Sequence, residues 1–197
     1  MKRISLRLWF TASQRRKLEI FIYMALLVLG CMAGTFFTQK YDNIPICRFC
    51  IKYGMPELSA NNADVFFTAV FKNTGLLILS MFFGLCAVGQ PCLLGILLFH
   101  SFSAGCCLVK LSSGITVSGI PVYIVAAAYT AVTSIILLLA VRESVRAATA
   151  AFRMYVSEND GELLICKRLK LYFIRFGVLF FMNLVSSGIY AVFCGFF

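Results

Sequence analysis

Few side chains in this sequence are of a type that could do chemistry, and their spacing limits what that chemistry could be. Cys47 and Cys50 form a C-x-x-C pair in a mixed, polar segment. A zinc ribbon needs a second such pair and a thioredoxin-type site needs a βαβ setting, and the sequence has neither. The pair is therefore expected to be a local disulfide or two free thiols.

His100 is the only histidine, and it lies halfway along an apolar run. An ionisable residue inside a membrane is a functional candidate by default. No acidic residue falls in the predicted spans to form a relay with it. We therefore expect a packing role, with a neutral imidazole bonded to nearby Ser101 or Ser103, and proton or metal handling is the alternative. Asn183 and Gln90 are expected to form hydrogen bonds between helices.

Arrangements that support catalysis are missing from the sequence. It has no paired carboxylates in an apolar run, no phosphate-binding glycine loop, no Ser/His/Asp set and no H-E-x-x-H motif. Catalysis inside such a bundle would lack general acids and bases. We expect a protein that is not an enzyme and that uses no metal and no cofactor.

The composition indicates which elements must position these residues. Of the 197 residues 61% are hydrophobic and 13% are charged, against about 25% charged in soluble domains. No acidic residue lies between Asp64 and Glu143. A soluble fold could not cover such a stretch with polar surface, so the sequence predicts an all-α, polytopic protein of the cell membrane, in contact with the lipid bilayer.

The net charge of +10 could attract nucleic acid, but the placement of the charge argues against that partner. Twelve of the 18 basic residues lie in two short segments: Lys2, Arg3, Arg7, Arg15, Arg16 and Lys17, then Arg142, Arg146, Arg153, Lys167, Arg168 and Lys170. Lysine and arginine accumulate in cytoplasmic segments of membrane proteins. Both segments are therefore expected inside the cell.

Five apolar runs predict five spans, with the N-terminus inside and the C-terminus outside. We assign residues 1–18 to a basic cytoplasmic N-terminus, 19–37 to the first span, 38–72 to an extracytoplasmic loop, 73–141 to a three-helix membrane core, 142–170 to a basic cytoplasmic loop and 171–197 to the last span. Arg175, near the start of that span, is expected to reach the cytoplasmic headgroups.

Three alternatives stay open at this point. The first run could be a cleaved signal, although a retained span is preferred. Residues 65–71 could form an interfacial helix or be an early start of the second span. Residues 73–109 could be a re-entrant hairpin instead of two spans.

Small residues recur at four-residue spacing, which lets helix backbones approach closely in lipid. The pairs are Gly30 and Gly34, Ser80 and Gly84, and Ser101 and Gly105. Packing within one bundle is the favoured interpretation, and homo-oligomer formation is the alternative. Gly89 and Pro91 predict a tight helical hairpin, because proline fits the first turn of a helix.

The order of these elements resembles the stage II sporulation protein M family. The resemblance rests on the aromatic stretch from Phe66 to Gly75, then Gly84, Gly89-Gln90-Pro91 and Gly105, and it covers nearly the whole chain. The cysteines are not a feature of that family.

The resemblance implies a non-enzymatic scaffold that recruits septal peptidoglycan hydrolases, stage II sporulation proteins D and P, during forespore engulfment. It places the protein in the mother-cell membrane of a Gram-positive endospore former, and the partners would meet the outer loop and outer helix ends. The alternative function is a permease subunit of an ATPase-driven exporter, with residues 142–170 as the coupling segment.

Overall fold

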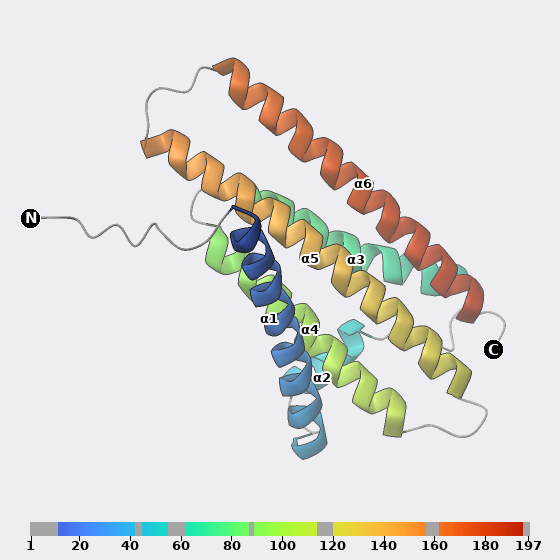
Figure 1. Cartoon of the computed structure of the whole chain (residues 1–197). Helices are drawn as coiled ribbons and strands as arrows, with labels where there is room; N and C mark the ends of the chain where they lie inside the picture. The colour runs from blue at the N-terminus through green and yellow to red at the C-terminus, as the bar shows by residue number, and fades with distance from the viewer. Residues whose placement is uncertain are drawn as a thin grey trace, which may run out of the picture.

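The described part of the chain is helical, without strands (Figure 1). The computed structural model describes residues 12–41, 45–54, 62–86, 89–113, 120–156 and 162–194, with the backbone alone at some helix ends. Its helices are α1 (Ala12–Lys40), α2 (Pro45–Gly54), α3 (Asn62–Leu85), α4 (Gln90–Ser113), α5 (Ile120–Val156) and α6 (Glu162–Cys194). The predicted segments at residues 1–11, 114–119, 157–161 and 195–197, which include three of the N-terminal basic residues and the chain end, lie outside the described residues.

Five of these helices are long and apolar enough to cross a bilayer, so the prediction of a polytopic helical membrane protein with five spans is confirmed. The apolar segments are Leu18–Lys40, Ala63–Leu85, Gln90–Ser113, Ile120–Phe152 and Leu169–Cys194. The shortest has 23 residues, about 35 Å of helix against a hydrocarbon core of about 30 Å. Large apolar side chains cover the outside of the bundle; Phe21 and Phe71, for example, are 70% and 72% exposed. Such a surface is suited to lipid.

The second span begins earlier than the predicted boundary between residues 72 and 73. α3 is continuous from Asn62 to Leu85, which favours the early-start alternative over a separate interfacial helix. In the sequence, the charge of Lys72 indicated a loop at this position. Three acids also fall in the apolar helices, namely Glu19, Asp64 and Glu143, so the expectation that the spans hold no carboxylate was wrong.

The helices form a bundle in which α4 is shared by two groups. α3, α5 and α6 pack against one another, and α5 also contacts α4. α1 crosses α4 and makes its main packing contacts there, while the short α2 lies against the same helix (Figure 1). The buried core combines side chains of all five long helices, among them Tyr23, Leu77, Leu97, Val141 and Phe176.

The turn between α3 and α4 has the predicted hairpin form. The Gly89 carbonyl accepts the Leu93 N–H at 3.1 Å, so Gly89 caps α4. Pro91 lies in the first turn of α4, where a backbone N–H has no acceptor within the helix, so the N–H that proline lacks is not needed. A Cβ on Gly89 would overlap the Phe83 carbonyl oxygen. Both helices have the length to span, which favours two spans over a re-entrant hairpin.

α5 is longer than a bilayer is thick and continues into residues 142–156, which the sequence assigned to the basic cytoplasmic loop. Its 37 residues correspond to about 55 Å, roughly 25 Å more than the hydrocarbon thickness. The end of α5 and the start of α6 project beyond the starts of α1 and α4 (Figure 1). This projection carries the second basic segment, which is expected inside the cell.

Candidate functional site

A small polar cavity lies inside the bundle between α2, α3, α4 and α5. Its volume is about 40 Å³, and its polar lining comes from Tyr53, Lys72, Asn73, His100, Ser103, Tyr129, Thr130 and Thr133. These residues belong to segments far apart in the sequence, and only the packing of α2, α3, α4 and α5 brings them together. A cavity of this size has room for a few waters and no larger ligand.

Side chains around this cavity bond the helices to one another. The Asn73 amide donates to the Tyr129 hydroxyl at 2.7 Å, and that hydroxyl lies 3.3 Å from the Ser187 hydroxyl. These contacts join α3, α5 and α6. The Tyr129 ring also stacks on Tyr190 of α6, with ring centroids 4.3 Å apart. Polar contacts between membrane helices of this kind fix their register.

His100 points to α5, away from the serines that were expected to bond it. Its Nε2 lies 3.2 Å from the Ser134 hydroxyl, whereas Ser101 and Ser103 bond to backbone carbonyls. The single hydroxyl proton of Ser134 goes to the Thr130 carbonyl at 2.7 Å. The contact of the imidazole with Ser134 thus joins α4 to α5.

Asn183 of α6 lines a second, smaller cavity of about 10 Å³, which Asn73 and His100 line as well. Its amide nitrogen donates to the Thr74 hydroxyl at 3.3 Å, as expected of a polar link between helices, and its Oδ1 is buried without a partner. Gln90 bonds the Thr149 hydroxyl at 3.0 Å in the same way. One water fits the smaller cavity and would satisfy the amide oxygen.

The short helix α2 forms one wall of the larger cavity. The Tyr53 hydroxyl donates to the Lys72 carbonyl at 3.0 Å, and burial raises the pKa of this hydroxyl. The Phe49 and Tyr53 rings lie 6.5 and 5.5 Å from the Phe99 ring near the middle of α4. α2, which belongs to the predicted outer loop, thus packs on the bundle.

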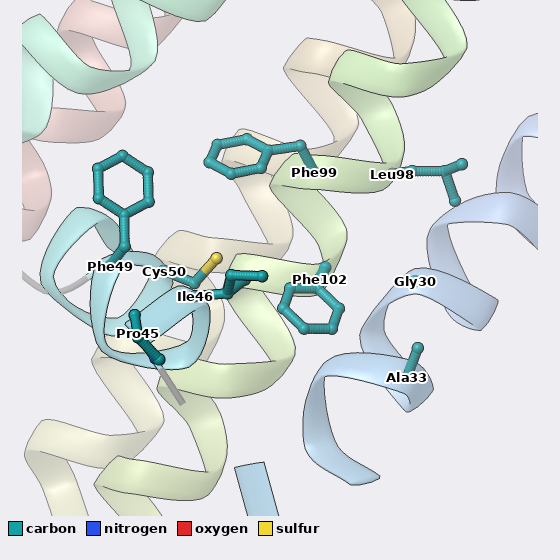
Figure 2. A pocket seen from close by; sticks show the side chains of 9 residues that line it. All are labelled: Gly30, Ala33, Pro45, Ile46, Phe49, Cys50, Leu98, Phe99 and Phe102. Carbon is teal, nitrogen blue, oxygen red and sulfur yellow. The ribbon is translucent and has the colours of Figure 1, made fainter. Parts of the chain in front are cut away.

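An open apolar groove of about 530 Å³ runs beside α2. Figure 2 shows Gly30 and Ala33 of α1 on one side, Ile46 and Phe49 of α2 on the other, and the side chains of α4 between them. The lining is completed by Pro45, Cys50, Leu98, Phe99 and Phe102. Its apolar character suits lipid chains or an apolar partner and offers no group for acid–base chemistry.

Charged side chains of α1, α5 and α6 form a small ion-pair network. Arg175 of α6, which is expected to reach the cytoplasmic headgroups, pairs with Glu143 of α5 and is 56% exposed. Arg146 lies 3.2 Å from Glu143 and 4.0 Å from Glu19 of α1. These pairs link α1, α5 and α6 near the basic end of the bundle. Their shared carboxylate, Glu143, is only 19% exposed.

The predicted small residues lie at close helix contacts inside the bundle. On α1, Cβ atoms on Gly30 and Gly34 would overlap Ser101 and the Phe102 carbonyl of α4, and one on Gly105 would overlap the Cys31 carbonyl. The pair on α1 therefore meshes with the pair on α4. This occupies the surfaces that the alternative of homo-oligomer formation would need.

Gly84 and Ser80 mark the other close contact, where α3 meets α5 and α6. A Cβ on Gly84 would overlap the Tyr172 hydroxyl, and Ser80 is fully buried. The Tyr172 hydroxyl donates to the Met81 carbonyl at 2.9 Å and lies 3.2 Å from Ser144. Gly84 thus leaves the room in which Tyr172 joins three helices.

The polar side chains around the cavity join helices to one another. His100 and Asn73 each contact a hydroxyl of α5, and the cavity beside them has room for a few waters. Among the described residues, no three or more His, Cys, Asp or Glu side chains are placed to hold a metal ion.

Sequence reasoning missed Lys72, Tyr129, Tyr172 and Glu143. Lys72 was assigned to a loop, and the two tyrosines lie in apolar runs where a hydroxyl gives little signal. The i, i+3 spacing of Glu143 and Arg146 could have indicated the ion pair. The pairing of Glu143 with Arg175 of α6 could not be predicted in this way, because it depends on how the two helices pack.

Comparison of the chain with protein-family models, with curated proteins and with solved structures finds no match. The geometry described above is therefore the basis for a functional proposal, together with the resemblance carried by the aromatic stretch and the glycines.

Proposed function

We propose that this protein is a non-enzymatic membrane scaffold of the stage II sporulation protein M type, which recruits septal peptidoglycan hydrolases during forespore engulfment. One observation carries the proposal: three of the four glycines on which the resemblance rests, all but Gly75, lie at contacts that leave no room for a Cβ. Gly84 makes room for Tyr172, Gly89 forms the hairpin turn and Gly105 lies against α1. A pattern that specifies how the helices pack is expected to be kept in a scaffold of this type.

The distribution of polar groups also supports a scaffold. Interior side chains such as Asn73, His100 and Tyr172 bond neighbouring helices, and the cavities between them hold only water-sized molecules. The exposed face of α2 includes Ile46 and Phe49, which are 65% and 61% exposed. In the expected topology this face and the outer helix ends would meet the hydrolase-containing proteins D and P.

The first experiment is a clean deletion of the gene in its host. Engulfment of the forespore, followed by membrane-dye microscopy, is expected to stop at the septum and to recover when the wild-type gene is restored. Normal engulfment in the deletion strain would remove the scaffold proposal.

A second experiment localises the partner surface. The Ile46→Ala, Phe49→Ala double variant is expected to lose co-purification of proteins D and P while its membrane level stays normal. Phe71→Ala is the matched control, because Phe71 is 72% exposed, at least as much as Ile46 and Phe49, but lies on α3 within a span. Equal losses in both variants, or in neither, would contradict the assignment to α2.

A permease subunit of an ATPase-driven exporter is the second candidate. It is favoured by a cleft of about 330 Å³ between the projecting ends of α5 and α6, lined by Ala147, Ala150, Ala151 and Leu169. A coupling segment for an ATPase would be expected in this position. Pulldown of the intact protein from crosslinked membranes separates the two: an ATPase as the chief partner favours export, and hydrolases favour the scaffold.

A further inference from the structure

The groove between α1 and α2 is a fixed feature of the bundle, because both helices are held on α4. α1 meets α4 through the close backbone contacts at Gly30 and Gly34. α2 is attached to the same helix by a hydrogen bond of 2.8 Å from the Ser103 hydroxyl to the Cys50 carbonyl, and Cys47 and Cys50 are buried there as free thiols. α1 and α2 make few contacts with each other. The space between them, over α4, is the open groove of about 530 Å³.

The groove presents apolar surface to the outside of the bundle. In Figure 2 the Ile46 side chain of α2 extends toward Phe102 of α4, and Gly30 on the facing side of α1 has no side chain to close the gap. Apolar surface of this kind is unfavourable in water, and hydrocarbon covers it without that cost. The groove therefore calls for an apolar occupant.

The depth of the groove places that occupant among lipid acyl chains. Ring contacts lead outward from it: Phe37 of α1 lies 6.0 Å from Phe102 and 6.1 Å from Tyr41. The Lys40 ammonium lies 5.6 Å from the centre of the Tyr41 ring, and tyrosine with lysine is typical of the membrane–water interface. Ala33, on the groove wall, precedes Lys40 by seven residues, or about 10 Å of helix. The groove thus lies below the headgroups, in the hydrocarbon layer.

The charges at the Lys40 end of the groove favour an anionic headgroup. The charged residues of α2 and of the last turns of α1 and α4 are all basic, namely Lys40, Arg48, Lys52 and Lys110. The segment that connects α1 to α2 contains one acid, Asp42, so the excess of charge stays positive. Basic residues beside the interface attract acidic lipids.

We propose that this groove binds one acyl chain of an anionic phospholipid, whose phosphate lies at Lys40. The chain covers the apolar walls on α1, α2 and α4, and the headgroup meets the basic residues at the interface. The proposal does not depend on the proposed function. The bound lipid would fill the space between α1 and the face of α2 to which that function assigns partners.

The test uses the intact protein, reconstituted alone in phosphatidylcholine vesicles with a small amount of phosphatidylglycerol that carries a diazirine in the middle of one acyl chain. After illumination, peptide mass spectrometry is expected to find this lipid attached mainly to the groove walls on α1, α2 and α4. Ala33→Phe, which fills the groove from α1, should lose most of these adducts. Met32→Phe is the matched control, because Met32 is the neighbouring residue but lies outside the groove and is 63% exposed.

A second measurement tests the headgroup, with photoreactive phosphatidylcholine of the same chain as the reference. Wild-type protein is expected to give more adduct with phosphatidylglycerol, and Lys40→Gln should lower the ratio of the two yields about fivefold, as expected for one basic residue at an anionic surface. The attachment site should not move. Lys170→Gln is the matched control, because Lys170 is exposed on α6 at the other end of the bundle.

Three outcomes would overturn the proposal. The first is labelling of α3 and α6 as heavy as that of the groove walls, or equal losses in Ala33→Phe and Met32→Phe. The second is an equal yield of the two lipids in the wild type. The third comes from native membranes, where a photoreactive leucine analogue at position 33 should attach to lipid, and attachment to a second copy or to another protein would contradict the proposal. Because the vesicles hold no other protein, their result is independent of the scaffold function.

Discussion

At the scale of single residues, the closest contacts in this bundle are made by groups with almost no side chain. Gly30, Gly34 and Gly105 let α1 and α4 cross with backbone against backbone. In lipid, such helices gain little from burying apolar surface, because lipid tails are equally apolar, and close van der Waals packing supplies the attraction. A single methyl group at this crossing is therefore expected to matter.

Gly34→Ala is expected to reduce the free energy of unfolding by about 1–3 kcal/mol, since the added Cβ would overlap the backbone of Phe102, which cannot move away alone. Gly177→Ala is the matched control, because a Cβ there meets nothing within 4 Å. It should be neutral or slightly stabilising, since alanine favours a helix by about 1 kcal/mol over glycine. Unfolding in mixed micelles measures both, and equal effects would refute the close-contact explanation.

Glu143 and Arg175 provide a second residue-scale prediction. Glu143→Gln and Arg175→Gln are each expected to destabilise the protein, and a double-mutant cycle should give a coupling of about 1 kcal/mol, since the Glu143 side chain is largely shielded while Arg175 is partly exposed. The coupling should weaken in high salt, because the arginine end is open to screening. A coupling near zero at low salt would mean that the pair contributes nothing to stability.

At the scale of the helices, α2 is the element whose position is least expected from its sequence. Its two cysteines and Tyr53 face α4 and the polar cavity, while Ile46 and Phe49 face outward. Burial and the neighbouring thiols Cys106 and Cys47 raise the pKa of the Cys50 thiol from 9.0 to about 11. The docked position of α2 therefore favours the protonated thiol.

This raised pKa predicts that the attachment of α2 weakens in alkali. The undocked thiol ionises from about pH 9 and the docked one only near pH 11, so docking binds the proton more tightly and loses stability as the pH rises between these values. Deuterium exchange of the α2 backbone, corrected for the intrinsic rate at each pH, should show more opening at pH 10.5 than at pH 8. Cys50→Ala should remove most of this difference, and an unchanged difference would contradict the assignment to Cys50.

At the scale of the whole molecule, an odd number of spans places the two chain ends on opposite sides of the membrane. The basic residues before the first span and after the fourth then both face the cytoplasm. In this expected topology α5 and α6 project on the cytoplasmic side, and α2 lies on the other. Each partner surface proposed above depends on this sidedness.

Accessibility labelling tests the sidedness directly. A cysteine introduced by Asp160→Cys, in a variant without the native cysteines, should react with a membrane-impermeant maleimide only after the cells are permeabilised. A reporter fused after Phe197 should be active outside the cytoplasm. A tag at residue 160 that reacts in intact cells would reverse the topology, and a cytosolic reporter would change the number of crossings.

The sequence by itself determined the helical class, the number of spans, the hairpin turn at Gly89 and Pro91, and the residues at which helices approach closely. These follow from local properties, because a run of about 20 apolar residues in lipid can satisfy its backbone only as a helix. Only the tertiary structure decided that α3 continues through Lys72, that His100 bonds Ser134, and that Ser103 of α4 bonds the Cys50 carbonyl of α2. Those outcomes depend on which helices become neighbours, and in a bundle whose outer faces are all apolar no local pattern selects the neighbour.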